Sequence, residues 1–166
     1  MKKIILFSVF CSLLFVSCSD NDDYENDLNA QISTYRANAI CSLLESVARH
    51  PENGTHLDSV ARISLGVFNP SNIQNEKTEG ENRGKVMSSL FESISRQPEA
   101  DSLLSAITQK YIGAYKPEYF SDNTIYIARI IATENYIEAI SRQPEASVSL
   151  KYAALKFLNY DFSTEK

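Results

Sequence analysis

The feature that most constrains the fold is a seven-residue stretch that occurs twice without a change. Ile94 to Ala100 reads ISRQPEA, and Ile140 to Ala146 reads the same. A looser copy, VARHPEN, runs from Val47 to Asn53. Such internal copies are typical of repeat proteins, in which one supersecondary unit is used several times. We therefore expect three copies of one structural unit.

The prolines of these stretches place the three copies in register. Pro51, Pro98 and Pro144 are separated by 47 and 46 residues. Apolar residues recur four positions before each proline and six and fourteen after it: Val47, Ile94 and Ile140; Leu57, Leu104 and Leu150; Leu65, Ile112 and Leu158. Polar residues recur fifteen, six and two positions before it: Arg36, Arg83 and Arg129; Glu45, Glu92 and Glu138; Arg49, Arg96 and Arg142.

The spacing of apolar residues predicts a helix on each side of each proline, because they recur at steps of three and four. The residue before a proline disfavours α geometry, and proline itself suits the first turn of the next helix. One helix pair cannot bury its own apolar stripe, whereas stacked pairs bury a continuous core. We expect an all-α domain of three helix-Pro-helix repeats of about 46–47 residues, stacked as a short α-solenoid or helical bundle.

The expected helical domain covers residues 29–166, with units at about 29–68, 80–116 and 122–162. The stretch from Asn69 to Glu81, NPSNIQNEKTEGE, has one proline, one glycine and a single sizeable apolar residue. This composition is typical of a linker, so the second unit is expected to begin only near residue 80.

The first 18 residues have the layout of a cleavable export signal. Lys2 and Lys3 precede an apolar run over residues 4–16, which is shorter than the about 20 residues that a membrane-spanning helix needs. The stretch LFVSC at 14–18 resembles the lipobox of bacterial lipoproteins, with Phe15 where leucine is usual. The resemblance implies a signal peptide over residues 1–17 and a lipid, including palmitate, on Cys18 that binds the protein to a membrane.

Residues 18–28 hold five acidic side chains and no basic one. A run of this kind repels itself and cannot bury apolar area, so we expect an extended, solvated tether. It resembles the acidic stretch behind the lipidated cysteine of Bacteroidetes-type surface-exposed lipoproteins. The resemblance implies an outer-membrane lipoprotein exposed at the cell surface. A periplasm-facing protein with a plain acidic spacer stays open as the alternative.

Charge and residue types exclude several classes of partner and chemistry. Cleavage before Cys18 removes two lysines and no acid, which leaves 14 bases against 21 acids and a net charge of −7. No basic stripe offers a nucleic-acid interface. His50 and His56 lack the spacing of a zinc pair, and no Gly-x-Ser-x-Gly motif surrounds a serine. We expect no metal, no cofactor and no enzymatic activity.

Two sets of residues are candidates for binding. The Glu and Arg pairs four residues apart at each unit have a structural explanation, because such pairs stabilise a helix. The other arginines lie near the start of each first helix, where the helix dipole disfavours a cation, so they are candidate partner-binding residues: Arg36, Arg83 and Arg129. Aromatic residues between the second and third units are candidates for glycan stacking or for packing: Tyr115, Tyr119, Phe120 and Tyr126.

These features predict a lipid-anchored cell-envelope protein that acts as a non-enzymatic helical-repeat interaction module for another envelope protein or a peptide. A glycan-binding accessory lipoprotein that uses the aromatic residues is the alternative. A small envelope hydrolase is a distant third, since it needs a polar cleft for which no motif is present.

Overall fold

The computed structural model describes residues 20–162, so the signal peptide and the lipidation residue Cys18 lie outside it. Over this range the chain is all-α, with six α-helices, as the apolar periodicity predicted. They are α2 (Asp20–Arg49), α3 (Gly54–Leu65), α4 (Glu76–Arg96), α5 (Asp101–Ile112), α6 (Asp122–Arg142) and α7 (Ser147–Leu158). The chain divides into two parts after Ile32, and the part from Ser33 onward holds the packing described below.

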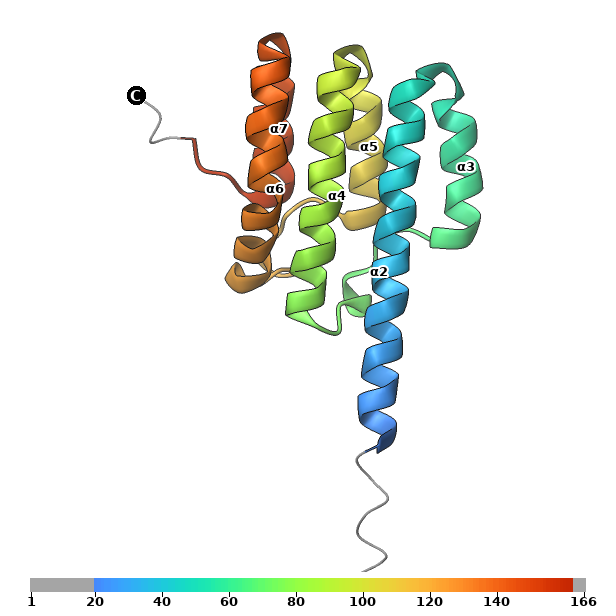
Figure 1. The fold of residues 1–166 in the computed structure, drawn as a ribbon. Helices are drawn as coiled ribbons and strands as arrows, with labels where there is room; N and C mark the ends of the chain where they lie inside the picture. The colour runs from blue at the N-terminus through green and yellow to red at the C-terminus, as the bar shows by residue number, and fades with distance from the viewer. Residues whose placement is uncertain (1–19, 163–166) are drawn as a thin grey trace, which may run out of the picture. The chain divides into compact units, whose positions relative to one another are not determined.

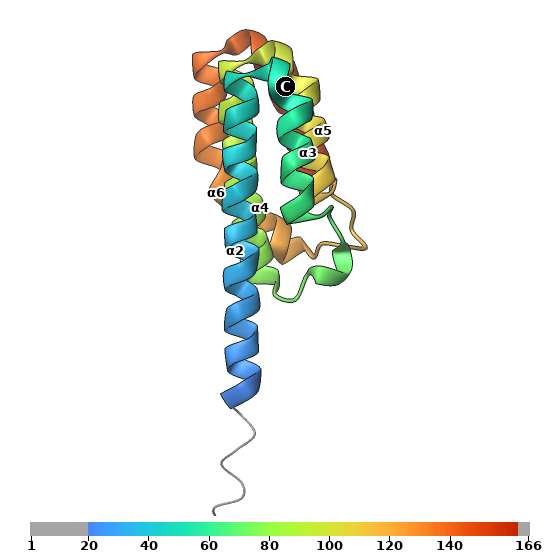
Figure 2. The same ribbon diagram turned by 90° about the vertical axis from the view of Figure 1, so that its right-hand side faces the viewer.

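The helices of this second part form three pairs, each joined at one of the three prolines (Figure 1). The first helices α2, α4 and α6 lie side by side in one layer, and the second helices α3, α5 and α7 form the other (Figures 1 and 2). This arrangement is a short α-solenoid of three units.

The junction inside each pair repeats the same backbone geometry. Before the proline, His50, Gln97 and Gln143 have φ of −139°, −140° and −138° and ψ of 69°, 72° and 72°, outside the helical region. The proline then begins a three-residue 3₁₀ turn that leads directly into the second helix: Pro51–Asn53, Pro98–Ala100 and Pro144–Ala146. The proline therefore turns the chain with almost no loop, as expected.

A side-chain contact also recurs at the junctions. Gln97 and Gln143 each donate through Nε2 to the glutamate two positions on, at 2.6 Å in both units. His50 stands in the same position of the first unit, and its Nδ1 lies 3.3 Å from Glu52 Oε1. The histidine thus fills a structural position of the repeat, which accounts for it without a metal.

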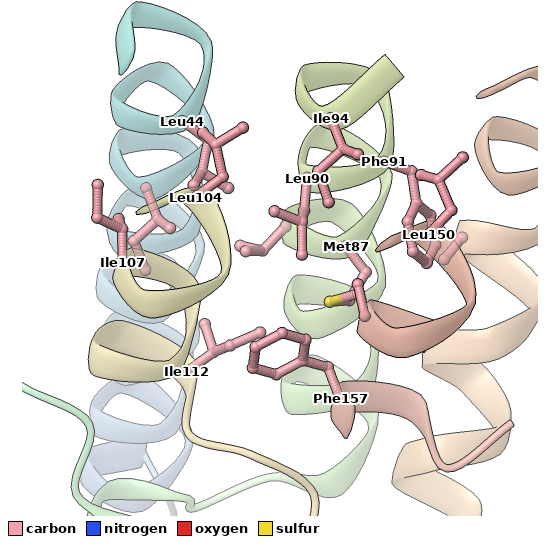
Figure 3. Packing of buried hydrophobic residues seen from close by; sticks show 14 of the residues in the cluster. Leu44, Met87, Leu90, Phe91, Ile94, Leu104, Ile107, Ile112, Leu150 and Phe157 are labelled. Carbon is pink, nitrogen blue, oxygen red and sulfur yellow. The ribbon is translucent and has the colours of Figure 1, made fainter. Parts of the chain in front are cut away.

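The core runs through all three units between the two layers. Figure 3 shows side chains from different units meeting there, with Phe157 of α7 pointing toward Ile112 of α5. Met87, Leu90, Phe91 and other core side chains are fully buried. Each buried side chain of this size stabilises the fold by about 1.5–3 kcal/mol, so the stacked units supply the stability that one pair lacks.

Two glycines allow α4 to approach α6 closely. A Cβ on Gly80 would lie 2.8 Å from the carbonyl oxygen of Thr124, and one on Gly84 would lie 2.7 Å from Cβ of Ile131. Both distances are shorter than a side chain tolerates. The two residues are four apart, so they lie on one face of α4. The second and third units therefore pack backbone against backbone at this point.

Helix α2 begins at Asp20, nine residues before the expected start at Asn29. The acidic segment over residues 20–28 is helical, so the prediction of an extended conformation is wrong for these residues. Extending an existing helix costs far less than starting one. The side chains from Glu25 to Leu28 are exposed, in agreement with a solvated segment.

Helix α4 also begins earlier than expected, at Glu76 and not near residue 80. Asn75 caps it, because its side-chain oxygen accepts from the backbone N–H of Thr78 at 3.0 Å. Glu76 and Glu79 add negative charge to the first turn. The expected linker is thereby shortened, and it contains a further 3₁₀ turn at Pro70–Asn72.

Candidate functional surfaces

The three arginines predicted to bind a partner cap the second helices of the solenoid. Arg83 and Arg129 lie near the start of their helices, whereas Arg36 lies in the middle of α2, because that helix begins at Asp20. Each guanidinium reaches the last carbonyls of the second helix in the same unit. Arg36 Nε donates to Leu65 O at 3.1 Å, Arg83 Nη2 to Ile112 O at 2.7 Å, and Arg129 Nε to Leu158 O at 2.7 Å. Because a cation is favourable at a helix C-terminus, the neighbouring helix supplies the stabilisation that the arginine's own helix lacks.

Two of these arginines also bind the next unit. Arg36 Nη2 donates to Tyr111 O at 2.9 Å, and Arg83 Nη1 lies 3.4 Å from Phe157 O. Arg129 Nη2 instead donates to Asn159 O, directly after the second helix of its own unit. The second helices end at residues with positive φ in the same register: Gly66, Gly113 and Asn159. Each arginine lies thirty residues before such a terminus, so the cap is part of the repeat.

Arg83 is the most enclosed member of the set, with 1% of its surface exposed. Its guanidinium also donates to Gly113 O and lies 3.9 Å from the centre of the Phe120 ring. Its Nε is buried without a hydrogen-bond partner. Burial lowers the pKa of Arg83 to about 10, against the opposing charge of Glu79. Arg83 therefore has no surface to offer a partner, which corrects the expectation for this residue.

Arg36 and Arg129 are more accessible than Arg83, but their donors are used in the same way. Desolvation lowers the pKa of Arg36, and the nearby Glu79 opposes that effect. Glu79 lies near both Arg36 and Arg83, yet burial is the larger influence and raises the pKa of its carboxyl group. All three arginines thus cap helix ends of the fold, and Glu79 is a partly buried acid beside Arg36 and Arg83.

The Glu and Arg pairs have the structural role that their spacing predicted. Within α2, α4 and α6 they form ion pairs, at 2.6 Å between Arg96 Nη2 and Glu92 Oε1. They also link the units, since Arg96 Nη1 lies 3.7 Å from Glu45 Oε1 and Arg142 Nη1 lies 3.7 Å from Glu92 Oε1. The result is a row of alternating charge across the three first helices.

The four candidate glycan-stacking residues do not form one exposed surface. Phe120 is only 2% exposed, because it lies under Arg83 and stacks on Phe68 with 5.7 Å between ring centres. Tyr119 packs at the edge of the same group, and Lys116 Nζ lies 5.2 Å from its ring centre. Tyr126 is exposed on α6, and Tyr115 donates its backbone N–H to Lys156 O at 2.9 Å. Packing therefore explains Phe120, which cannot stack on a sugar.

An exposed apolar stripe lies on α7, which sequence reasoning did not single out. It consists of Val148, Tyr152 and Leu155, which are each more than half exposed and lie at steps of four and three on one helix face. The corresponding residues of the other second helices are polar or small and also exposed: Ser102, Ala106 and Gln109 in α5, and Thr55, Ser59 and Arg62 in α3. The stripe is therefore not needed for stacking the units.

Membrane-spanning segments, metal sites and reactive cysteines were also considered for the described helices, between residues 20 and 162. None of the helices between residues 20 and 162 is long and apolar enough to cross a membrane. Over the same range, no three His, Cys, Asp or Glu side chains are arranged to hold a metal ion. Cys41 is a free thiol whose pKa is raised by burial, and its Sγ lies 3.7 Å from Lys85 O. That environment does not activate it as a nucleophile.

Comparison with known proteins adds no further assignment, since neither family models nor curated proteins nor solved structures give a match to this chain.

Proposed function

We propose that this chain is a lipid-anchored cell-envelope protein whose three-unit solenoid is a non-enzymatic interaction module. The observation that supports an interaction role is the exposed apolar stripe of Val148, Tyr152 and Leu155 on α7. Contiguous exposed apolar side chains that the fold does not require are characteristic of surfaces that bind other proteins. Since the stripe has helical spacing, it suits an amphipathic segment of a partner protein laid along α7.

The charges around the stripe restrict the partner. Lys151 and Lys156 flank Tyr152 on α7, and Lys156 Nζ lies 5.4 Å from the Tyr152 ring centre. An apolar segment that carries acidic residues beside its apolar face would match both features. The partner in this proposal is therefore a protein or peptide of the envelope with an acidic, amphipathic segment.

A pull-down from detergent-solubilised envelopes tests this role with a matched pair of variants. Tyr152→Asp places a charge in the stripe, whereas Ala106→Asp places the same charge at the corresponding position of α5. Wild-type protein and Ala106→Asp should capture the same partner, and Tyr152→Asp should lose it. Equal capture by all three proteins, or no specific partner for wild type, would argue against the α7 surface.

The anchor and the location are separate parts of the proposal. They rest on the lipobox-like stretch that ends at Cys18 and on the acidic residues that follow it. Cys18→Ala should release the protein from the membrane fraction and abolish incorporation of labelled fatty acid. Protease treatment of intact cells should release the domain from a surface-exposed protein, whereas full protection would place it in the periplasm.

A further inference from the structure

The C-terminal end of the solenoid exposes positions that are used for stacking in the other units. In α4, Gly80, Gly84 and Phe91 are buried on the side that packs on α6. The corresponding residues of α6, forty-six positions later, are Tyr126, Ile130 and Ile137. Each of these is more than half exposed. This face thus exposes apolar stacking positions on α6, beside the part of the helix that Tyr160 and Phe162 cover by packing on Tyr136.

The N-terminal end of the solenoid shows the complementary pattern. Tyr35 on α2 and Val60 on α3 are each more than half exposed. Their counterparts in the later units are buried: Asn82 and Ala128 for Tyr35, and Ile107 and Ala153 for Val60. Asn82 faces the preceding unit, because its Nδ2 donates to Ser33 Oγ of α2 at 2.9 Å. The N-terminal face of the domain therefore presents apolar side chains at positions that stacking elsewhere covers.

The row of alternating charge is also incomplete at both ends. Glu45 and Glu92 each contact two arginines, one in their own unit and one in the next. Glu138, at the C-terminal face, pairs with Arg142 of its own helix. Arg49, at the N-terminal face, pairs with Glu45 of its own helix, whereas Arg96 and Arg142 each contact two glutamates. Glu138 at the C-terminal face can thus pair with a further arginine, and Arg49 at the N-terminal face can pair with a further glutamate.

We propose that copies of this chain associate head to tail, with the C-terminal face of one copy on the N-terminal face of the next. The contact would pair Glu138 of one copy with Arg49 of another, in the register that joins Glu92 to Arg142 within the chain. It would also cover Ile130 and Ile137 with the α2 face that holds Tyr35. Charge and register favour a second copy as the occupant, because both faces derive from one repeat.

The side chains at the ends make this contact looser than the internal ones. Tyr126 and Ile130 stand where Gly80 and Gly84 let α4 and α6 touch, so a docked helix would lie farther away. With this looser packing, the association is expected to be weak in dilute solution. Anchoring at a membrane would raise the effective concentration of the copies. Because the two faces differ, the contact does not close and can extend into a chain.

Chemical cross-linking of the full-length protein in its native envelope tests this arrangement. In a Cys41→Ser background, which removes the partly exposed free thiol, Arg49→Cys and Glu138→Cys are made singly and together, and a short thiol-reactive bifunctional cross-linker is added. The head-to-tail contact predicts no dimer from either single variant, a dimer when both are co-expressed, and a ladder of multimers from the double variant. The pair Glu92→Cys with Arg142→Cys, which is 3.7 Å apart within the chain as an ion pair, serves as the positive control for reactivity.

Two further substitutions, each added to the Arg49→Cys and Glu138→Cys double variant, test which surfaces form the multimers. Ile130→Asp should reduce the yield of cross-linked multimers by about tenfold or more, since it removes an isoleucine that the contact would bury. Tyr152→Asp, on the separate α7 stripe, should leave it unchanged. A dimer from Glu138→Cys alone would indicate a symmetric contact between C-terminal faces and would overturn the proposal. The proposal would also be overturned if the double variant gave no multimers while the positive control reacted. Neither result would bear on partner capture through α7, which the pull-down measures separately.

Discussion

Replacing Arg83 with alanine should destabilise the protein far more than replacing an exposed arginine. The substitution removes the donors to Ile112 O at 2.7 Å, to Gly113 O at 3.0 Å and to Phe157 O at 3.4 Å. It also removes the guanidinium from the Phe120 ring, 3.9 Å away. The carbonyls belong to the ends of α5 and α7, so the substitution affects two units at once.

The size of the effect follows from these contacts. Hydrogen bonds from a charged donor contribute about 1.5–3 kcal/mol each, and buried carbonyls left without a donor cost about 1–3 kcal/mol. The desolvation that lowers the pKa of Arg83 to about 10 no longer opposes folding in the variant, which offsets part of the loss. A net loss of about 3–5 kcal/mol in the free energy of unfolding is expected. That is a large share of the about 5–15 kcal/mol of a typical domain.

Urea unfolding followed by circular dichroism measures this loss directly. Arg49→Ala is the control, because Arg49 is exposed and forms an ordinary surface ion pair with Glu45. This substitution should lower the free energy of unfolding by about 0.5 kcal/mol or less. Arg83→Lys should restore little, since one ammonium group lacks the planar fork that spans the carbonyls of two helices. An Arg83→Ala protein as stable as Arg49→Ala would show that the carbonyl contacts do not stabilise the solenoid.

Three further substitutions address other contacts. Burial raises the pKa of Glu79, so ionisation of its carboxyl group destabilises the folded protein. Wild type should therefore lose stability relative to Glu79→Gln as the pH rises above the ordinary glutamate pKa of about 4.3. Parallel urea titrations at several pH values measure this difference, which would be absent if the carboxyl group were solvated. Gly84→Ala should destabilise the protein by about 1–3 kcal/mol, because the new Cβ would lie 2.7 Å from Cβ of Ile131. A higher denaturant midpoint for this variant would contradict the close approach of α4 and α6. Tyr160→Ala should lower stability by about 1–2 kcal/mol in thermal melts, since it removes a ring stacked on Tyr136 at 5.7 Å; an unchanged melt would mean that the C-terminal segment does not cover α6.

The repeat could be predicted from the sequence because proline acts locally. Pro51, Pro98 and Pro144 place a helix boundary wherever they stand, so the ends of the first helices followed directly from their positions. Helix starts are less well marked. Asn75 begins α4 through a single side-chain hydrogen bond in a stretch whose composition is that of a linker. The acidic run was expected to be extended because composition does not reveal that α2 continues through it.

The roles of single side chains depended on the packing of the helices. Arg36, Arg83 and Arg129 looked unfavourable because only the dipole of their own helix was considered, whereas the neighbouring antiparallel helix ends beside them. The sequence does show that Gly66 and Gly113 each lie thirty residues after an arginine. This spacing indicates a helix cap only once the arrangement of the helices in two layers is known. The α7 stripe was missed for a similar reason. Apolar residues at helical spacing indicate a core, and only the neighbouring units determine which side of α7 is covered.

The double contacts of Arg36 and Arg83 have a consequence for how the protein opens. Each side chain binds the end of the second helix in its own unit and in the next, so neither helix end can be released without loss of its neighbour's cap. In a linear array of units, such shared contacts raise the coupling between neighbours relative to the stability of each unit alone. Local opening should therefore involve whole units and not single helices. We expect hydrogen exchange to protect the ends of α5 and α7 together, with the same free energy of opening.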